Sequence, residues 1–173
     1  GIIQGNYGHA IVSEGNSGKI TINGGIIEGV NGSIIADDGG NGEITINGGV
    51  LKHSGSMGYG IRINNGSKLI INGGIINCEG AIYTYDANGN SNAVIQINGG
   101  EITGGIRAGT GQLSISHGKV YGNISNSNCA ATTLLIQNNS DIQVSGTSAF
   151  SKAPTVKAGT GYTGGVTYYN SVT

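Results

Sequence analysis

A six-residue motif recurs along the chain and restricts its fold more than any other feature of the sequence. It reads ITINGG at 20–25 and 44–49, LIINGG at 69–74 and IQINGG at 95–100, with weaker copies at 113–118 and 134–139. The slot held by Asn23 in the first copy recurs after 24, 25, 26, 18 and 21 residues. A unit of that length, with two or three short strands and no helix-length segment, is typical of one coil of a β-solenoid.

Three strands are expected in each coil. Apolar residues alternate with polar ones in the first strand, so one side of it should face the interior. Its inward pairs are Ile20/Ile22, Ile44/Ile46, Leu69/Ile71, Ile95/Ile97, Leu113/Ile115 and Leu134/Ile136. We predict an all-β fold, a right-handed parallel β-helix (β-solenoid) of about six to seven coils of three short strands. It should cover residues 1–152, and residues 153–173, which lack the motif, should form a C-terminal cap or the start of a linker.

The second and third strands are placed by slots that stay apolar. Inward slots of the second strand hold Ile27, Leu51, Ile76, Ile102, Val120 and Ile142, and those of the third hold Ile11, Ile34, Ile61, Ile82, Ile106, Ile124 and, more weakly, Phe150. The outward slot of the second strand forms an apolar stripe of Ile2, Ile26, Val50 and Ile75. Such a stripe should be covered, by a flanking part of a longer chain, a second copy or the tail from Ala153.

The asparagine that ends the first strand marks a corner of the coil. Asparagine accepts a positive φ better than any residue except glycine, so we expect this conformation at Asn72. Stacked corners should also bring the amides of Asn23, Asn47, Asn72 and Asn98 within hydrogen-bonding distance, as a structural Asn ladder. Independently solvated turn residues are the alternative.

Composition and charge exclude several classes of function. Charged residues make up 10 % of the chain and the formal net charge is −1, so no nucleic-acid partner is expected. Apolar runs are only a few residues long, so no membrane insertion is expected. The segment 1–5 repeats 25–29, which indicates a fragment that begins mid-coil in a longer protein with flanking domains. Cys78 and Cys129 lie about two coils apart, too far for a disulfide, so both should be free thiols.

Large side chains recur on the outward face of the third strand. Its outward slots read Val12, Ile35, Arg62, Tyr83, Arg107 and Ser125. Arg62, Tyr83 and Arg107, with Tyr85 beside them, are the candidate ligand-binding residues. A tyrosine between two guanidinium groups can stack on a sugar while the arginines pair with a carboxylate or sulfate. The alternative is a solvated cation–π ladder in which Tyr83 packs between two arginine stems.

Carboxylates near the end of the third strand suggest a weaker site. Asp37, Asp38 and Asp86 could supply the hard oxygen ligands that calcium prefers. The segments that contain them, 37–40 and 85–90, also have the composition of ordinary loops. No other cofactor is expected. His53 and Cys78 share a slot on neighbouring coils, which is too few ligands for zinc. No catalytic residues are identified, because no Ser, His and acid arrangement appears.

The ITINGG corner, followed by an apolar pair and a Gly-rich loop, resembles the repeat of right-handed parallel β-helix regions in bacterial surface proteins and adhesins. It is also similar to β-helical carbohydrate-binding proteins related in fold to polysaccharide lyases. The resemblance covers residues 1–150 and implies an extracellular location, at a bacterial surface or secreted. It also implies contact with a polysaccharide or host glycan. We therefore expect a non-catalytic adhesion or carbohydrate-binding module, with a structural stalk or a calcium-dependent lyase-like enzyme as alternatives.

Overall fold

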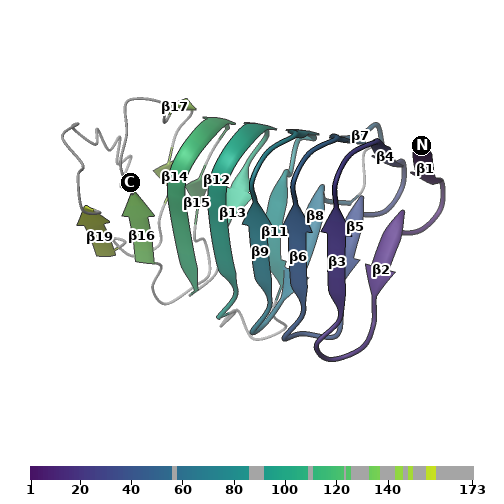
Figure 1. Cartoon of the computed structure of the whole chain (residues 1–173), viewed down its shortest axis with the longest axis horizontal. Helices are drawn as coiled ribbons and strands as arrows, with labels where there is room; N and C mark the ends of the chain where they lie inside the picture. The colour runs from purple at the N-terminus through teal and green to yellow at the C-terminus, as the bar shows by residue number, and fades with distance from the viewer. Residues whose placement is uncertain are drawn as a thin grey trace.

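The computed structural model is a parallel β-solenoid (Figure 1). It describes residues 1–55, 58–85, 92–108, 111–122 and 124–125, and strands at 133–136, 143–145, 148–149 and 155–158, with side chains described to Ile124 except that of Tyr85. Every strand pair in this part of the chain is parallel, and none of its residues is helical. The all-β fold class predicted from the repeat is confirmed.

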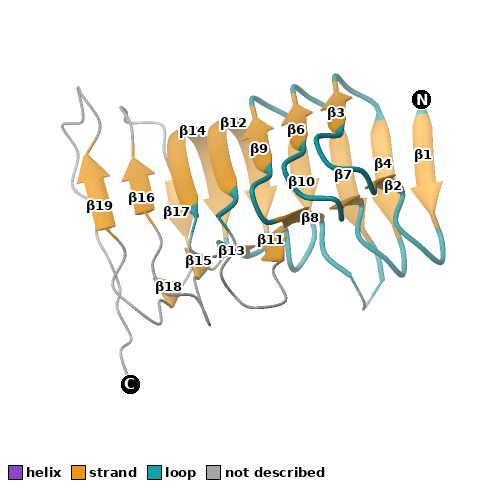
Figure 2. Ribbon diagram, turned by 90° about the horizontal axis from the view of Figure 1, so that it is seen from below, coloured by secondary structure: helices purple, strands orange, loops and turns teal. Residues whose placement is uncertain are grey.

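The strands form three stacks, one for each strand of a coil (Figures 1 and 2). The first stack holds β3 (Lys19–Ile22), β6 (Glu43–Ile46), β9 (Lys68–Ile71), β12 (Val94–Thr103), β14 (Gln112–Tyr121), β16 (Thr133–Ile136) and β19 (Thr155–Ala158). The second holds β1 (Ile2–Gly5), β4 (Ile26–Gly29), β7 (Val50–His53), β10 (Ile75–Asn77), the later halves of β12 and β14, and β17 (Gln143–Ser145). The third holds β2 (Ile11–Ser13), β5 (Ile35–Asp37), β8 (Ile61–Asn64), β11 (Ile82–Tyr85), β13 (Ile106–Arg107), β15 (Ile124–Ser125) and β18 (Ser148–Ala149). Because β12 and β14 continue around the asparagine corner, the first two stacks join into one sheet.

The number of turns is smaller than expected. About four turns of the solenoid are shown, not six to seven. The prediction counted each copy of the motif as a full coil, including the two weak copies after Gly100. Beyond Arg107 the turns are shorter, and segments outside the described residues interrupt them. In the C-terminal segment, β19 pairs with β16 at the end of the sheet opposite β1; the assignment of 153–173 as a cap or linker stays a prediction.

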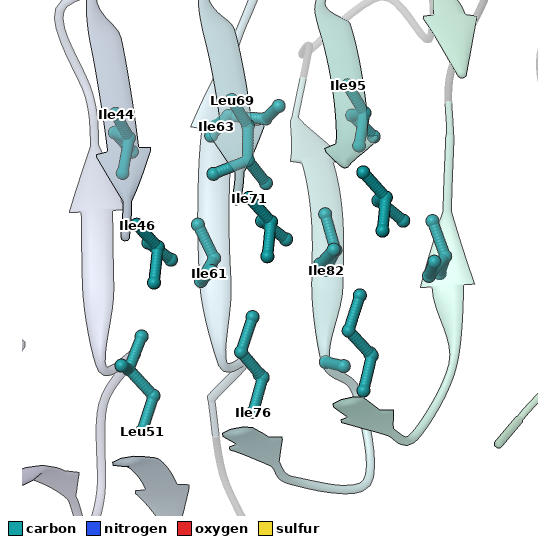
Figure 3. Packing of buried hydrophobic residues seen from close by; sticks show 14 of the residues in the cluster. Ile44, Ile46, Leu51, Ile61, Ile63, Leu69, Ile71, Ile76, Ile82 and Ile95 are labelled. Carbon is teal, nitrogen blue, oxygen red and sulfur yellow. The ribbon is translucent and has the colours of Figure 1, made fainter. Parts of the chain in front are cut away.

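Aliphatic side chains from all three stacks fill the interior. Isoleucine stacks on isoleucine in the first strand, where Ile46, Ile71 and Ile97 are each at most 1 % exposed. Leu51 and Ile76 enter from the second strand and Ile61 and Ile82 from the third (Figure 3). Each such side chain contributes about 1.5–3 kcal/mol by burial. The inward slots predicted for the first two strands are confirmed wherever the structure describes them.

The third strand differs from its prediction by one residue in one coil. Ile35, not Ile34, pairs with Ile11 and Ile61 in the inward slot, which moves Ala36 into the outward slot beside Val12 and Arg62. Ile34, which comes just before the strand, is also fully buried. Two adjacent isoleucines satisfy the apolar pattern equally well, so only the strand pairing distinguishes them.

The corner uses its two residue types for different purposes. Asn72 does not have a positive φ, contrary to the prediction; instead Gly74, two residues later, has a φ of 92°. The same glycine position is positive in the other regular coils, at Gly25, Gly49 and Gly100, and in the weaker copy at Gly118. Glycine takes this conformation at lower cost than asparagine, and a Cβ on Gly74 would lie 2.9 Å from the Gly49 carbonyl oxygen.

Asparagine supplies the ladder instead. The Asn47 amide donates to Asn23 Oδ1 at 2.8 Å, Asn72 to Asn47 at 2.8 Å and Asn98 to Asn72 at 3.0 Å. Ser116 continues the row by donating to Asn98 Oδ1 at 3.1 Å. The amides are therefore bonded from coil to coil rather than independently solvated.

Candidate functional site

The third stack brings three of the predicted site residues into one row. Arg62 pairs in register with Tyr83, and Tyr83 with Arg107, on the neighbouring strands β8, β11 and β13. The outward direction follows from the alternation within each strand, because Ile61, Ile82 and Ile106 are buried. Tyr85 pairs with Asn64 in the same register, but its side chain lies outside the described part.

Arg62 is held by a carboxylate of the preceding coil. Its guanidinium donates to Asp38 Oδ1 in an ion pair, and the Asn64 amide donates to the Asp38 carbonyl oxygen at 3.0 Å. The side chains of Arg62 and Asp38 are 25 % and 37 % exposed, so this pair is accessible from solvent. Asp38 therefore offsets part of the positive charge that Arg62 brings to this face.

Tyr59 joins the row although the sequence analysis did not select it. Its ring stacks on that of Tyr83 with centroids 4.2 Å apart and planes inclined by 10°. The Arg107 guanidinium carbon lies 5.1 Å from the Tyr83 ring centroid. Gly80 makes room for this stack, since a Cβ there would lie 2.9 Å from Tyr59 Cδ1. The sequence indicates this contact only through the position of Tyr59, three residues before Arg62. Tyr59 lies in a loop outside the repeated motif, so the repeat does not predict where its side chain points.

This arrangement limits how the row can bind a ligand. Tyr59 precedes β8 and Arg107 lies on β13, the two strands that flank β11. Tyr83 thus contacts the Tyr59 ring and the Arg107 guanidinium group. Because these groups already lie against the Tyr83 ring, a sugar would meet mainly the ring edges and phenol groups of the tyrosines and the guanidinium groups. These groups favour hydrogen bonding and charge pairing over stacking on Tyr83.

The structure describes two of the three aspartates proposed for calcium, and it holds these two in separate contacts. Asp37 is 1 % exposed, and the Ser67 hydroxyl donates to its Oδ2 inside the solenoid. Asp38 is on the surface with Arg62, and Asp86 lies outside the described residues. No group of three or more His, Cys, Asp or Glu side chains suited to a metal occurs in the part that the structure describes. Asp37 and Asp38 are adjacent in sequence but serve separate contacts.

His53 and Cys78 have separate structural roles. His53 Nε2 lies 2.9 Å from the Gly32 carbonyl oxygen. Cys78 is buried and is a free cysteine, and its burial raises the pKa of the thiol to about 12 while the Gly60 backbone partly lowers it. Cys78 therefore fills the core as a free thiol, whereas Cys129 lies outside the described residues.

Comparisons with known proteins do not assign a family. A scan of family models, a search of curated proteins and a search of solved structures each gave no match. Within the described residues, no helix is long and apolar enough to cross a membrane.

Proposed function

We propose that this chain is a non-catalytic module that binds an acidic polysaccharide through the third-strand face. The observation that carries the proposal is the in-register row of Arg62, Tyr83 and Arg107, with Tyr59 stacked against it. The row presents two guanidinium groups on β8 and β13, the strands on either side of β11, each about one strand spacing from the central tyrosine. Planar guanidinium groups bind carboxylate and sulfate by paired hydrogen bonds. The proposed location is extracellular, at a bacterial surface or secreted, with a surface or host glycan as partner.

Binding at this face should be weak for each sugar. Exposed ion pairs contribute about 0.2–1 kcal/mol each, and salt screens them. The packing of Tyr83 against Tyr59 and Arg107 fixes the side chains before binding, which lowers the entropy cost. A repeating acidic polymer could contact the row several times, so we expect affinity to rise with oligosaccharide length.

The test is isothermal titration calorimetry with uronic-acid oligosaccharides and neutral oligosaccharides of the same length. The native chain should bind the acidic series, more weakly as salt increases. Tyr83→Ala with Arg107→Ala should reduce the affinity at least about tenfold. Lys19→Ala is the matched control, because Lys19 is an exposed cation that pairs with Glu43 at 3.9 Å in another stack.

A second variant tests the role of Asp38. Asp38→Asn removes the carboxylate that competes for Arg62, so it should strengthen binding of acidic sugars and leave neutral sugars unaffected. Equal binding of acidic and neutral sugars, or no binding by the native chain at millimolar sugar, would contradict the proposal. An unchanged affinity in the Tyr83 and Arg107 double variant would place any binding elsewhere.

A structural spacer is the second candidate function. It is favoured by the uninterrupted asparagine ladder and the repeated interior slots, which make the solenoid a regular rod over its described turns. A spacer would need no ligand, so the calorimetry above separates the two candidates.

A further inference from the structure

The second stack carries an apolar stripe on a face different from the row of Arg62, Tyr83 and Arg107. Ile2 pairs with Ile26, Ile26 with Val50 and Val50 with Ile75, so the stripe crosses β1, β4, β7 and β10 in register. Ile2 is 72 % exposed, Ile26 36 % and Ile75 44 %. The stripe was expected to be covered, yet nothing in the described chain covers it. The described strand of the tail, β19, lies at the opposite end of the sheet from β1 (Figure 1).

A line of polar residues runs beside the stripe, two positions further along the same strands. It reads Gln4, Glu28, Lys52 and Asn77 across the four strands. Glu28 and Lys52 occupy its two central places and form an ion pair at 3.2 Å. The Lys52 side chain is 46 % exposed and that of Glu28 18 %. Each strand thus offers one apolar and one polar side chain outward, with opposite charges at the centre.

This pattern is complementary to itself under one symmetry operation. A two-fold axis parallel to the strands, midway between β4 and β7, places the face against the same face of a second copy. Ile26 then opposes Val50 and Ile2 opposes Ile75, so apolar side chains meet apolar ones. Glu28 of each copy opposes Lys52 of the other.

Axes parallel to the strands but through β4 or β7 are disfavoured by charge. An axis through β4 opposes Glu28 to itself, and an axis through β7 opposes Lys52 to itself. A two-fold axis that runs along the solenoid, between the apolar stripe and the line of polar residues, places the isoleucines of one copy against the polar residues of the other. Glu101, which follows Ile75 in the outward slot, falls beyond the overlap in the favoured register.

We propose that this chain forms a homodimer through the stripe, with the two solenoid axes antiparallel and with Glu28 of each copy against Lys52 of the other. The overlap of four strands by three residues is roughly 19 Å by 10 Å. That is below the roughly 800 Å² per partner of a standard interface, so the dimer is weak and appears at high concentration.

Sedimentation equilibrium up to about 1 mM protein tests the dimer. The native chain should show a reversible rise from monomer to dimer mass. Val50→Glu should abolish the rise, while Thr21→Glu, which makes the same change in charge at an exposed position of another stack, should leave it unchanged. Circular dichroism spectra must match in all variants, so that loss of the fold is not read as loss of the dimer.

Charge complementation tests the register. Glu28→Lys makes the centre of the line entirely positive, and Lys52→Glu makes it entirely negative. Each variant alone should dimerise at least about tenfold more weakly than the native chain, because like charges then face each other. An equal mixture should recover dimer mass, because each positive site faces a negative one. If the native chain stays monomeric at 1 mM, the proposed dimer is wrong. If the equal mixture of the two variants dimerises no more strongly than either variant alone, the proposed register is wrong.

Discussion

Single glycines decide whether successive corners can stack. Gly49 has a φ of 98°, and a Cβ added there would lie 2.8 Å from the Gly25 carbonyl oxygen. The Asn-Gly-Gly corner therefore depends on its second glycine for both conformation and space. This explains why that position stays glycine in each of the four regular copies.

We predict that Gly49→Ala lowers the free energy of unfolding by about 1–3 kcal/mol or more, because strain and steric contact add. Urea unfolding followed by circular dichroism measures the change. Gly24→Ala is the control, since a Cβ at Gly24 meets nothing within 4 Å and its φ is not positive. It should change stability by less than about 0.5 kcal/mol. Equal effects of both substitutions would contradict the role assigned to the second glycine.

The thiol of Cys78 should be unreactive in the folded chain. Burial raises its pKa from the ordinary value of 9.0 to about 12, so very little thiolate is present at pH 8. We expect iodoacetamide to modify Cys78 only after denaturant is added, as read by peptide mass spectrometry. Because the folded pKa is the higher one, the stability linked to this group is full below pH 9 and falls as pH rises from about 9 to 12. Rapid labelling of Cys78 in the native chain at pH 8 would contradict its burial.

At the scale of one element, the corner ladder joins neighbouring coils outside the core. Asn72 both donates to Asn47 and accepts from Asn98, so each amide in the middle of the row uses its donor and its acceptor. The row is exposed, and each bond should contribute only about 0.5–1.5 kcal/mol. The ladder mainly sets the register of the coils, because a coil that slipped along its strands would lose the bonds of its asparagine to both neighbouring coils.

We predict that Asn72→Asp destabilises the chain by about 1–2 kcal/mol at pH 7, because a carboxylate cannot donate to Asn47 and repels its oxygen. Protonation of the new carboxyl group restores a donor, so the difference from the native chain should shrink near pH 3. Thermal unfolding of both proteins at the two pH values measures this. Asn16→Asp, at an exposed turn outside the ladder, is the control. A defect that does not change with pH would show that another effect causes it.

The whole molecule is stabilised by neighbours along one axis, so its stability should not be uniform. Ile3 is 48 % exposed although Ile27, in the same slot one coil later, is 3 % exposed. The strands of this terminal coil have a partner on one side only. A coil with one neighbour loses about half of its stacking interactions.

We predict that hydrogen exchange proceeds from this end. Amides of β1, β2 and β3 should exchange at least about tenfold faster than those of β6, β7 and β9, because opening the terminal coil breaks fewer contacts. Exchange measured by NMR or by mass spectrometry of peptides tests the gradient. Uniform protection across these strands would contradict it and would indicate a single cooperative unit. If the dimer forms at high concentration, protection of β1 should increase with it.

Much of this protein follows from the repeat alone. The 24- to 26-residue spacing and the alternation of Ile44, Thr45 and Ile46 determine the all-β class, the strand positions and the inward slots. They do so because a buried face must repeat every two residues along a strand and every coil along the axis. The row of Arg62, Tyr83 and Arg107 follows from the same periodicity.

The tertiary structure decided between positions that the periodicity of the sequence makes equivalent. Whether Ile34 or Ile35 faces inward depended on pairing with Ile61, because two adjacent isoleucines give the same pattern. The partners of Arg62 and Tyr83, Asp38 and Tyr59, come from loops where no repeat places a side chain. The positive φ went to the glycine rather than the asparagine, because a carbonyl oxygen of the preceding coil leaves no room for a Cβ at the glycine position.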